Sequence, residues 1–351
     1  MGNLRHTLRC YRSICLTSNR IAESSVPRYQ RTYNKHGIFF ERPHTFQVKK
    51  PSLIAVDVDG TLLHSDGQIS PRNLSALRLA ERNGVEVVIA TGRRHSFAMR
   101  VLRSADLNPA NALISSNGTV IRTVGADLIH RHYMPISTAL WLCEHVAEFR
   151  RTLVMTFDKV GTDGDDSHGA LVCEDVEDLH ASIGRWMQSN APYIAHVSKL
   201  EDALLSNPEQ DPPIQMMLCG TASRMAEAEA RLLEHPLVAG VGMHTHPEAE
   251  ITLHRTIYPD RDLSIVDILP AGCSKASALR HLAELRGISM TDVLAIGDNW
   301  NDVPMLEAAG QAALMNNAPA ELHRLAAERG WRIAPSNDKD GVAAVLESVL
   351  S

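Results

Sequence analysis

The first regular part of the chain alternates apolar runs of strand length with helical stretches. Residues 53–57 form an apolar run that ends in an acid, as expected for a central parallel strand buried on both faces. A Ser-Pro pair at 70–71 suits the cap and first turn of a helix, and Gly84 suits its end. The predicted elements of this part are a strand over 53–57, a helix over 70–84, a strand over 85–90, a helix after 91–93, and a strand and turn over 113–118.

The pattern changes in the middle of the chain, over residues 123–262. Helical stretches there are separated by short strand-like pieces and by polar loops, which is typical of an α+β unit. Helices are predicted over 136–150 and 223–235, and strands over 152–157, 170–174, 193–197, 214–218 and 250–253.

The first pattern returns toward the C-terminus. An amphipathic helix is predicted over 274–286, followed by an apolar strand that again ends in an acid, over 293–298. Two more strand and helix units, near 312–315 and 331–334, end in a helix over 341–350. We therefore predict an α/β fold with a Rossmann-like, doubly wound parallel sheet. It is built from residues 51–122 and 263–351 and interrupted by the insert of 123–262, and its ligands are expected beyond the carboxyl ends of the strands.

The distribution of charge separates the first 50 residues from the rest of the chain. Residues 1–50 hold ten basic and two acidic residues, a formal charge of +8, so a net charge of −6 leaves −14 on the remainder. An acidic body argues against a nucleic-acid partner, because phosphate backbones bind basic surfaces. No apolar run reaches the roughly 18–20 residues of a membrane-spanning helix, so we expect no membrane role.

The basic segment over 1–50 shows neither helical nor strand periodicity and is rich in Arg and Ser. It fits an organellar transit peptide, which would direct the protein to a mitochondrion or plastid. It also fits a disordered basic arm. A third interpretation is that translation starts at Val48, just before the first core strand, and that the protein is cytoplasmic. In all three cases the chemistry is expected beyond Val48.

Cysteine and histidine give little sign of a structural metal. The six cysteines are scattered, with no C-x-x-C pair, which favours buried thiols in a reducing compartment. His244, His246 and His254 lie close together in the sequence, but loop or sheet positions are favoured over a metal site.

The strongest chemical signal is the D-x-D-G-T motif that follows the first strand. Side chains two apart on an extended backbone point to the same side, so Asp57 and Asp59 can face one cleft. Gly60 then allows the chain to turn away. A lone D-x-D pair is weak evidence for a catalytic site, because acids at strand ends often form turns. The full D-x-D-G-T motif after an apolar strand favours a catalytic role over a turn-forming one.

With this motif the sequence resembles the haloacid-dehalogenase-like (HAD) superfamily of phosphatases, in its Cof-type branch with a large α/β cap. The resemblance rests on four motifs in order over about residues 51 to 350. They are D-V-D-G-T at 57–61, T-G-R at 91–93, Lys275 within P-A-G-C-S-K, and G-D-N-W-N-D at 297–302. It implies that the insert is a cap that sets substrate specificity.

The resemblance also implies catalytic roles. Asp57 is implied as the nucleophile that forms an aspartyl-phosphate, and Asp59 as the general acid and base. Two carboxylates facing a phosphate require a cation, and the implied cofactor is Mg²⁺. Its implied ligands are the side chains of Asp57 and Asp298 and the backbone carbonyl of Asp59, with Asp302 in an outer position that orients Lys275 or a metal-bound water.

The phosphoryl oxygens are expected to contact a separate set of donors. The resemblance implies Thr91, Gly92, Lys275 and Asn301 in this role. Arg93 either contacts phosphate or pairs with an acid. The loop at 117–118 either lines the cleft or is a simple turn.

The function expected from these residues is Mg²⁺-dependent hydrolysis of small phosphomonoesters, such as sugar phosphates or related metabolites. A phosphomutase or phosphotransferase acting on phospho-sugars uses the same pair of acids, and a non-catalytic phospho-ligand binding protein is the alternative from another class. The intact acid and base set argues against the last. In the insert, the candidates for specificity are His244, His246, Glu248 and Arg255, although an ordinary surface role is favoured for them.

Overall fold

The computed structural model describes residues 49–174, 181–206, 211–240, 248–258 and 262–351. All but the last two residues of the basic segment predicted over 1–50 lie outside this range. Within the described residues, no helix has the length and apolar character needed to cross a membrane.

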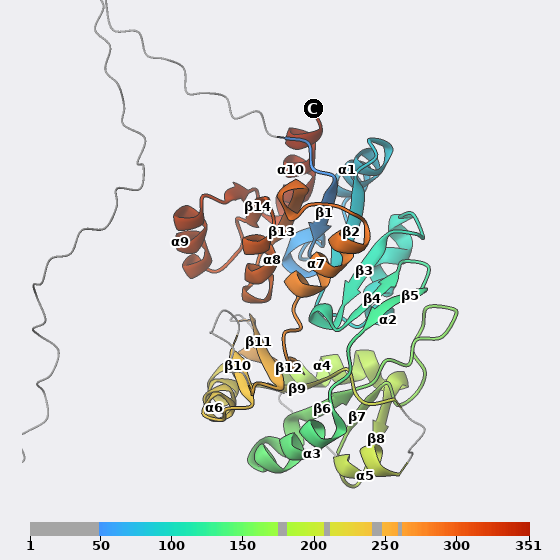
Figure 1. Ribbon diagram of the computed structural model, residues 1–351, viewed down its shortest axis with the longest axis vertical. Helices are drawn as coiled ribbons and strands as arrows, with labels where there is room; N and C mark the ends of the chain where they lie inside the picture. The colour runs from blue at the N-terminus through green and yellow to red at the C-terminus, as the bar shows by residue number, and fades with distance from the viewer. Residues whose placement is uncertain (1–48, 175–180, 207–210, 241–247, 259–261) are drawn as a thin grey trace, which may run out of the picture. The chain divides into compact units, whose positions relative to one another are not determined.

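The first sheet has eight strands and contains the chain segments that flank the insert (Figure 1). Its six strands from β15 to β3 are parallel, as predicted, and β1 lies between β13 and β2 near the centre. In spatial order the strands are β15 (Arg332–Ala334), β14 (Gln311–Met315), β13 (Val293–Gly297), β1 (Leu53–Val56), β2 (Glu86–Ala90), β3 (Ala112–Ser115), β4 (Val120–Thr123) and β5 (Leu128–Arg131).

Strands β4 and β5 make this sheet mixed rather than wholly parallel, which corrects the prediction. Each is antiparallel to its neighbour, because tight connections lead directly from β3 to β4 and from β4 to β5. The short turn over Ser116–Gly118 reverses the chain between β3 and β4.

Helices cover both faces of the first sheet, which confirms the doubly wound α/β architecture. One hydrophobic core joins α1, α2 and α10 to one face, and a second joins α7, α8 and α9 to the other. The bounds of these helices are α1 (Pro71–Arg82), α2 (His95–Leu102), α7 (Lys275–Leu285), α8 (Val303–Ala308), α9 (Ala320–Arg329) and α10 (Gly341–Leu350).

The second sheet has seven strands and is formed by the inserted part of the chain. Most neighbours are antiparallel, but β10 with β11 and β7 with β8 are parallel. In spatial order the strands are β10 (Val238–Gly240), β11 (Ile251–Tyr258), β12 (Leu263–Pro270), β9 (Gln215–Gly220), β6 (Leu153–Thr156), β7 (Leu171–Cys173) and β8 (Ile194–His196). The helices of this part are α3 (Ile136–His145), α4 (Ala181–Asn190), α5 (Leu200–Leu205) and α6 (Ala222–Leu233).

Apolar side chains of α3, α5 and α6 pack on one face of the second sheet. Leu142, Leu204 and Leu232 are examples, and they meet strand residues such as Met216 and Val266. Residues that alternate with these along the strands, Asp267 among them, point to the opposite face. One face of β12 therefore packs against the helices of the inserted part, and the other face carries Asp267.

Sheet membership puts the junctions of the insert later than the predicted residues 123 and 262. Strand β5 belongs to the first sheet, so the insert begins after Arg131, and β12 belongs to the second, so the insert ends at Pro270. The eight residues of β12 fall inside the segment 263–351 that was predicted as core. In the structure they pair antiparallel with β11 and β9.

The helix predicted over 136–150 is also shorter than expected. Helix α3 ends at His145 and a three-ten segment, Ala147–Thr152, continues the chain. The helix predicted over 223–235 corresponds to α6 within two residues at each end.

Candidate active site

Strand β1 delivers Asp57 to the carboxyl edge of the first sheet. The carboxyl group is buried, and the Asp57 backbone N–H donates to the carbonyl of Ile296 on β13. The chain then turns sharply through Gly60, whose φ of +77° is in the left-handed region that favours glycine. A Cβ at Gly60 would lie 2.3 Å from Oδ2 of Asp298, so only glycine lets the loop approach that carboxylate.

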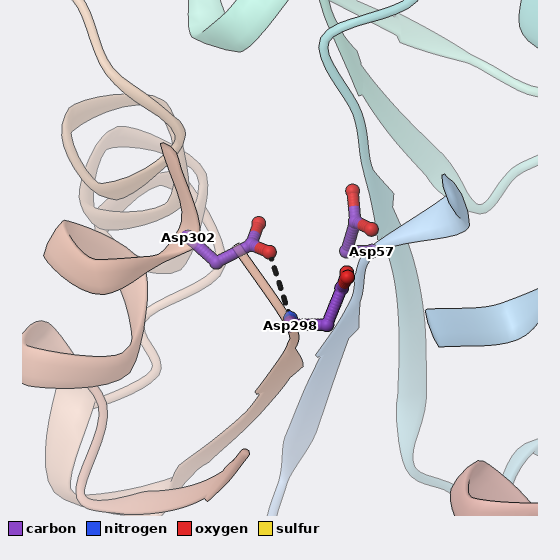
Figure 2. Close-up of side chains that lie close together, drawn as sticks. All are labelled: Asp57, Asp298 and Asp302. Atoms are coloured by element: carbon purple, nitrogen blue, oxygen red, sulfur yellow. Dashed lines mark hydrogen bonds between the residues drawn. The ribbon is translucent and has the colours of Figure 1, made fainter. Parts of the chain in front are cut away.

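Strand β13 places Asp298 beside Asp57. Val56 and Ile296 are paired in the parallel register of β1 and β13, so the acids follow neighbouring strand ends (Figure 2). The hydroxyl of Thr61 donates to Oδ1 of Asp298 at 3.0 Å. One carboxylate oxygen from each of Asp57, Asp298 and Asp302 lies within 4.8 Å of the others.

Lys275 is the buried cation of this cluster. It is the first residue of α7, whose start is fixed by a capping box between Ser274 and Ser277. The Nζ atom donates to Oδ1 of Asp57 and to Oδ1 of Asp302, each at 2.6 Å, and the Lys275 side chain is 0% exposed. A helix start therefore fixes the ammonium group between two acids from other elements.

Both oxygens of Asp302 are engaged by the protein itself. Oδ1 accepts from Lys275, and Oδ2 accepts from the backbone N–H groups of Asp298 (3.0 Å) and Asn299 (3.1 Å). Asp302 thus orients the lysine and the loop that carries Asp298.

The electrostatics of the cluster fit a bound cation. Burial and the neighbouring Asp302 raise the pKa of Asp57 to about 7, against the opposing effect of Lys275. Burial, followed by repulsion from Asp57 and Asp302, raises the pKa of Asp298 well above its usual range. Three buried carboxylates share one ammonium group, and their oxygens are the ligands that a hard divalent cation prefers. Asp57, Asp298 and Asp302 together form an acidic cluster that could hold such an ion.

Asp59 differs from the other acids because it is partly exposed and pairs with Arg93. The guanidinium donates from Nε to Oδ2 at 2.7 Å and from Nη2 to Oδ1 at 2.5 Å, a bidentate geometry. Of the two roles left open for Arg93, the structure shows the pair with an acid. The side chain of Asp59 is 41% exposed and accessible from solvent.

The T-G-R loop meets the turn after β3. The hydroxyl of Thr91 accepts from the N–H of Arg93, and the Thr91 carbonyl accepts from the N–H of Asn117. A Cβ at Gly92 would lie 3.1 Å from Oδ1 of Asn117. Asn301 then donates from Nδ2 to the same Oδ1 at 3.0 Å. Asn117 therefore connects the loops of Gly92 and Asn301, so it is more than a turn residue.

The inserted part contributes Asp267 and Tyr258 to these surroundings. Nδ2 of Asn117 donates to Oδ2 of Asp267 on β12 at 2.8 Å. Burial raises the pKa of Asp267 to about 7, with Asn117 and Lys275 acting in the opposite direction. Burial, with smaller contributions from the negative charges of Asp59 and Asp57, also raises the pKa of Tyr258 on β11.

Comparison with known proteins identifies the family. A model of the haloacid dehalogenase-like hydrolases matches residues 54–346. The chain belongs to this family. The predicted resemblance is confirmed, and the protein is an enzyme of the hydrolase class.

Similar proteins include two phosphatases of Bacillus subtilis (strain 168). Phosphatase YwpJ is 30% identical, with 85% of this chain and 99% of the relative covered. A 5-amino-6-(5-phospho-D-ribitylamino)uracil phosphatase, YwtE, is 28% identical, with 85% and 98% covered. Among solved structures, a haloacid dehalogenase-like hydrolase from B. subtilis gives a TM-score of 0.66 at 24% identity. The match covers 84% of this chain and 99% of that chain, which supports the fold.

Of the specificity candidates in this hydrolase, Arg255 has partners within the inserted part rather than among the acids of the site. Arg255 lies on β11 and pairs with Glu229 of α6, on the helix-covered face of the second sheet. His254, which was considered only as part of a histidine group for a metal, is buried and donates from Nε2 to the carbonyl of Cys273. Glu248 is exposed before β11, and the predicted candidates His244 and His246 lie outside the described residues.

Four residues near the site were missed in the sequence, namely Tyr258, Thr61, Asn317 and Asp267. Thr61 is the last residue of the first motif, but its bond to Asp298 depends on the turn at Gly60. Asn317 donates to the Gly60 carbonyl at 2.7 Å from a loop after β14. Asp267 had a visible signal, since it is a lone acid inside the apolar run L-S-I-V-D-I-L-P. An acid within a buried strand has to be accounted for by a partner.

Proposed function

We propose that this hydrolase is a Mg²⁺-dependent phosphatase that acts on small phosphomonoesters through an aspartyl-phosphate. The observation that carries the proposal is the buried group formed by Asp57, Lys275 and Asp302. Lys275 lies 2.6 Å from each carboxylate, and Asp298 is beside them. A carboxylate at a strand end, with a fixed cation beside it, is suited to attack a phosphoryl group.

In the first step, Oδ of Asp57 attacks phosphorus and the bond from phosphorus to the leaving oxygen breaks. Asp59 gives its proton to that oxygen, so the leaving group departs as an alcohol. In the second step, water attacks the same phosphorus, its proton passes to Asp59, and the Asp57 carboxylate and inorganic phosphate are released. The partial exposure of Asp59 allows it to meet both the leaving group and the water.

Mg²⁺ is proposed to be held by the side chains of Asp57 and Asp298 and by the backbone carbonyl of Asp59. When bound, it neutralises negative charge on the transferring phosphoryl group. Thr91, Gly92, Lys275 and Asn301 are proposed to contact the phosphoryl oxygens, and Asp302 to keep Lys275 in place. The support for Asp302 is that its oxygens are already engaged by Lys275 and two backbone N–H groups.

The substrate class is inferred from the relatives. Proteins with 27–29% identity include a pyridoxal phosphate phosphatase, an HMP-PP phosphatase and the phosphoribitylamino-uracil phosphatase, all named for small phosphorylated metabolites. We propose the same broad class for this chain, and that the inserted part, which brings Tyr258 near the site, selects within it.

The test is a screen of phosphorylated metabolites with the purified full chain, with release of inorganic phosphate as the readout. We expect release that requires Mg²⁺ and stops with EDTA, and we expect Asp57→Asn to lower kcat by at least about a thousandfold. Full activity in EDTA would overturn the metal assignment. Full activity of Asp57→Asn would overturn the nucleophile. Transfer of phosphate to a sugar hydroxyl instead of water would favour the mutase alternative.

A further inference from the structure

A chain of three buried side chains connects the two sheets. Asn301 donates from Nδ2 to Oδ1 of Asn117 at 3.0 Å, and Asn117 donates from Nδ2 to Oδ2 of Asp267 at 2.8 Å. The three residues are 8%, 0% and 6% exposed. They come from the loop after β13, the turn after β3 and the inserted strand β12.

The direction of these hydrogen bonds is fixed at one end. An amide side chain both donates and accepts, so a pair of amides can be turned over together without losing their mutual bond. An ionised carboxylate only accepts. Asp267 therefore requires Asn117 to present Nδ2 to it, which leaves Oδ1 facing Asn301. Asn301 must then present Nδ2 in its turn.

This orientation matters for phosphate. Nδ2 of Asn301 carries two hydrogens, and Asn117 accepts one of them. If the amide turned over, its oxygen would occupy the place of both N–H bonds. An oxygen there repels an anion, whereas an N–H attracts it. Burial raises the pKa of Asp267 to about 7, while the Asn117 N–H and the charge of Lys275 act in the opposite direction. At pH 8 the ionised form, which only accepts, therefore predominates, and the measurements below are made at that pH.

We propose that Asp267 is a positioning residue that, through Asn117, fixes the amide of Asn301 so that an N–H faces the phosphate. Asp267 touches neither substrate nor metal in this role. The inference rests on the proposed function only in taking Asn301 as a phosphate contact. It assigns to a strand of the inserted part an influence on phosphate affinity that acts through Asn117 and Asn301.

The experiment measures the Kd of inorganic phosphate by isothermal titration calorimetry in the presence of Mg²⁺, alongside KM and kcat. Asp267→Asn keeps the size of the side chain but can donate as well as accept, so it removes the fixed direction. We expect it to raise the phosphate Kd and KM by about fivefold, the loss of roughly one hydrogen bond, with a smaller change in kcat.

Coupling to Asn301 distinguishes positioning from a merely structural role. In an Asn301→Ala background the Asp267→Asn change should have no further effect on the phosphate Kd, because the group it acts through is gone. Asn117→Ala breaks the chain in the middle and serves as a second variant with the same expected behaviour. Glu229→Gln is the matched control, since it removes an acid of the inserted part that pairs with Arg255, and it should leave the phosphate Kd unchanged.

An unchanged phosphate Kd in Asp267→Asn would overturn the proposal. So would a phosphate Kd in the double variant that is raised by the product of the two single effects, because the two residues would then act independently. Calorimetry does not depend on turnover, so the positioning role of Asp267 and the phosphatase function can be refuted independently of each other. A chain that binds phosphate in an Asp267-dependent manner but hydrolyses no phosphomonoester refutes the phosphatase and keeps the positioning role.

Discussion

Nζ of Lys275 lies 2.6 Å from Oδ1 of Asp57, although 218 positions separate the two residues in the sequence. The ammonium group is held equally close to Asp302, and it is fully buried. Buried charges of this kind need partners of opposite sign, since an isolated charge in the protein interior is strongly unfavourable. The arrangement therefore links the reactivity of Asp57 to the stability of the fold.

Replacing Lys275 by Met removes the partner of two buried carboxylates. We expect the free energy of unfolding in metal-free buffer to fall by about 3–5 kcal/mol, measured by urea denaturation. Hydrolysis should fall by at least about a hundredfold, because charge on the transferring phosphoryl group loses a fixed cation. Lys339→Met, at an exposed position, is the control and should change neither quantity appreciably. Unaltered stability of Lys275→Met would contradict the buried charge cluster.

Mg²⁺ should stabilise the folded protein through Asp298. Ligand that binds only the folded state adds about 2.7 kcal/mol at a concentration a hundred times its Kd. We expect the wild-type Tm to rise with Mg²⁺, and this rise to be largely lost in Asp298→Asn. Asp338→Asn alters an exposed acid that accepts from Ser65, and it should keep the full shift. An equal Mg²⁺ shift in Asp298→Asn would show that the cation binds elsewhere.

Arg93 should influence the acid and base step through Asp59. Arg93→Ala removes the bidentate partner that orients this carboxylate. Proton transfer to the leaving group matters more for an alkyl phosphate than for p-nitrophenyl phosphate, whose leaving group departs readily as an anion. We therefore expect kcat to fall about tenfold or more with a sugar phosphate and by much less with p-nitrophenyl phosphate. Equal losses on both substrates would indicate that Arg93 acts in binding.

His95 should make the fold sensitive to moderate acid. It is 2% exposed, and neither ring nitrogen has a hydrogen-bond partner among the described residues. Burial, followed by repulsion from Arg122, lowers its pKa to about 4. Between that value and the ordinary pKa of about 6.5, the unfolded chain binds a proton that the folded chain does not. Stability therefore falls as the pH drops through this window.

The size of the His95 effect can be measured by urea unfolding at pH 7.5 and pH 5.5. One such group contributes a loss of about 1 kcal/mol over this interval. His95→Phe has no group to protonate and should lose correspondingly less on acidification. If the variant and the wild type lose the same amount, the buried neutral histidine is not responsible.

The core motifs were readable from sequence because they follow local rules. An apolar run that ends in an acid predicts a buried strand with a carboxylate at its end, and both Asp57 and Asp298 lie where this rule puts them. The glycine after the D-x-D pair is likewise a local requirement, confirmed by its positive φ. The acids at the strand ends and the glycine turn can therefore be predicted from the few residues on either side of them.

The extent of the inserted part was not readable in the same way. Strand β12 has the apolar composition of a core strand, and its assignment to the second sheet depends on its pairing with β11 and β9. Pairing between segments far apart is a tertiary property, which residue periodicity does not contain.

The sequence alone therefore determined the family, the α/β architecture and the acids at the strand ends, because motifs and hydrophobic periodicity are properties of residues that are close together in the sequence. Only the tertiary structure decided which groups meet. It placed Lys275 between Asp57 and Asp302, paired Arg93 with Asp59, and turned the lone acid of β12 toward Asn117. The reason is physical: a buried charge or amide must find a partner in space, and that partner can come from any part of the chain.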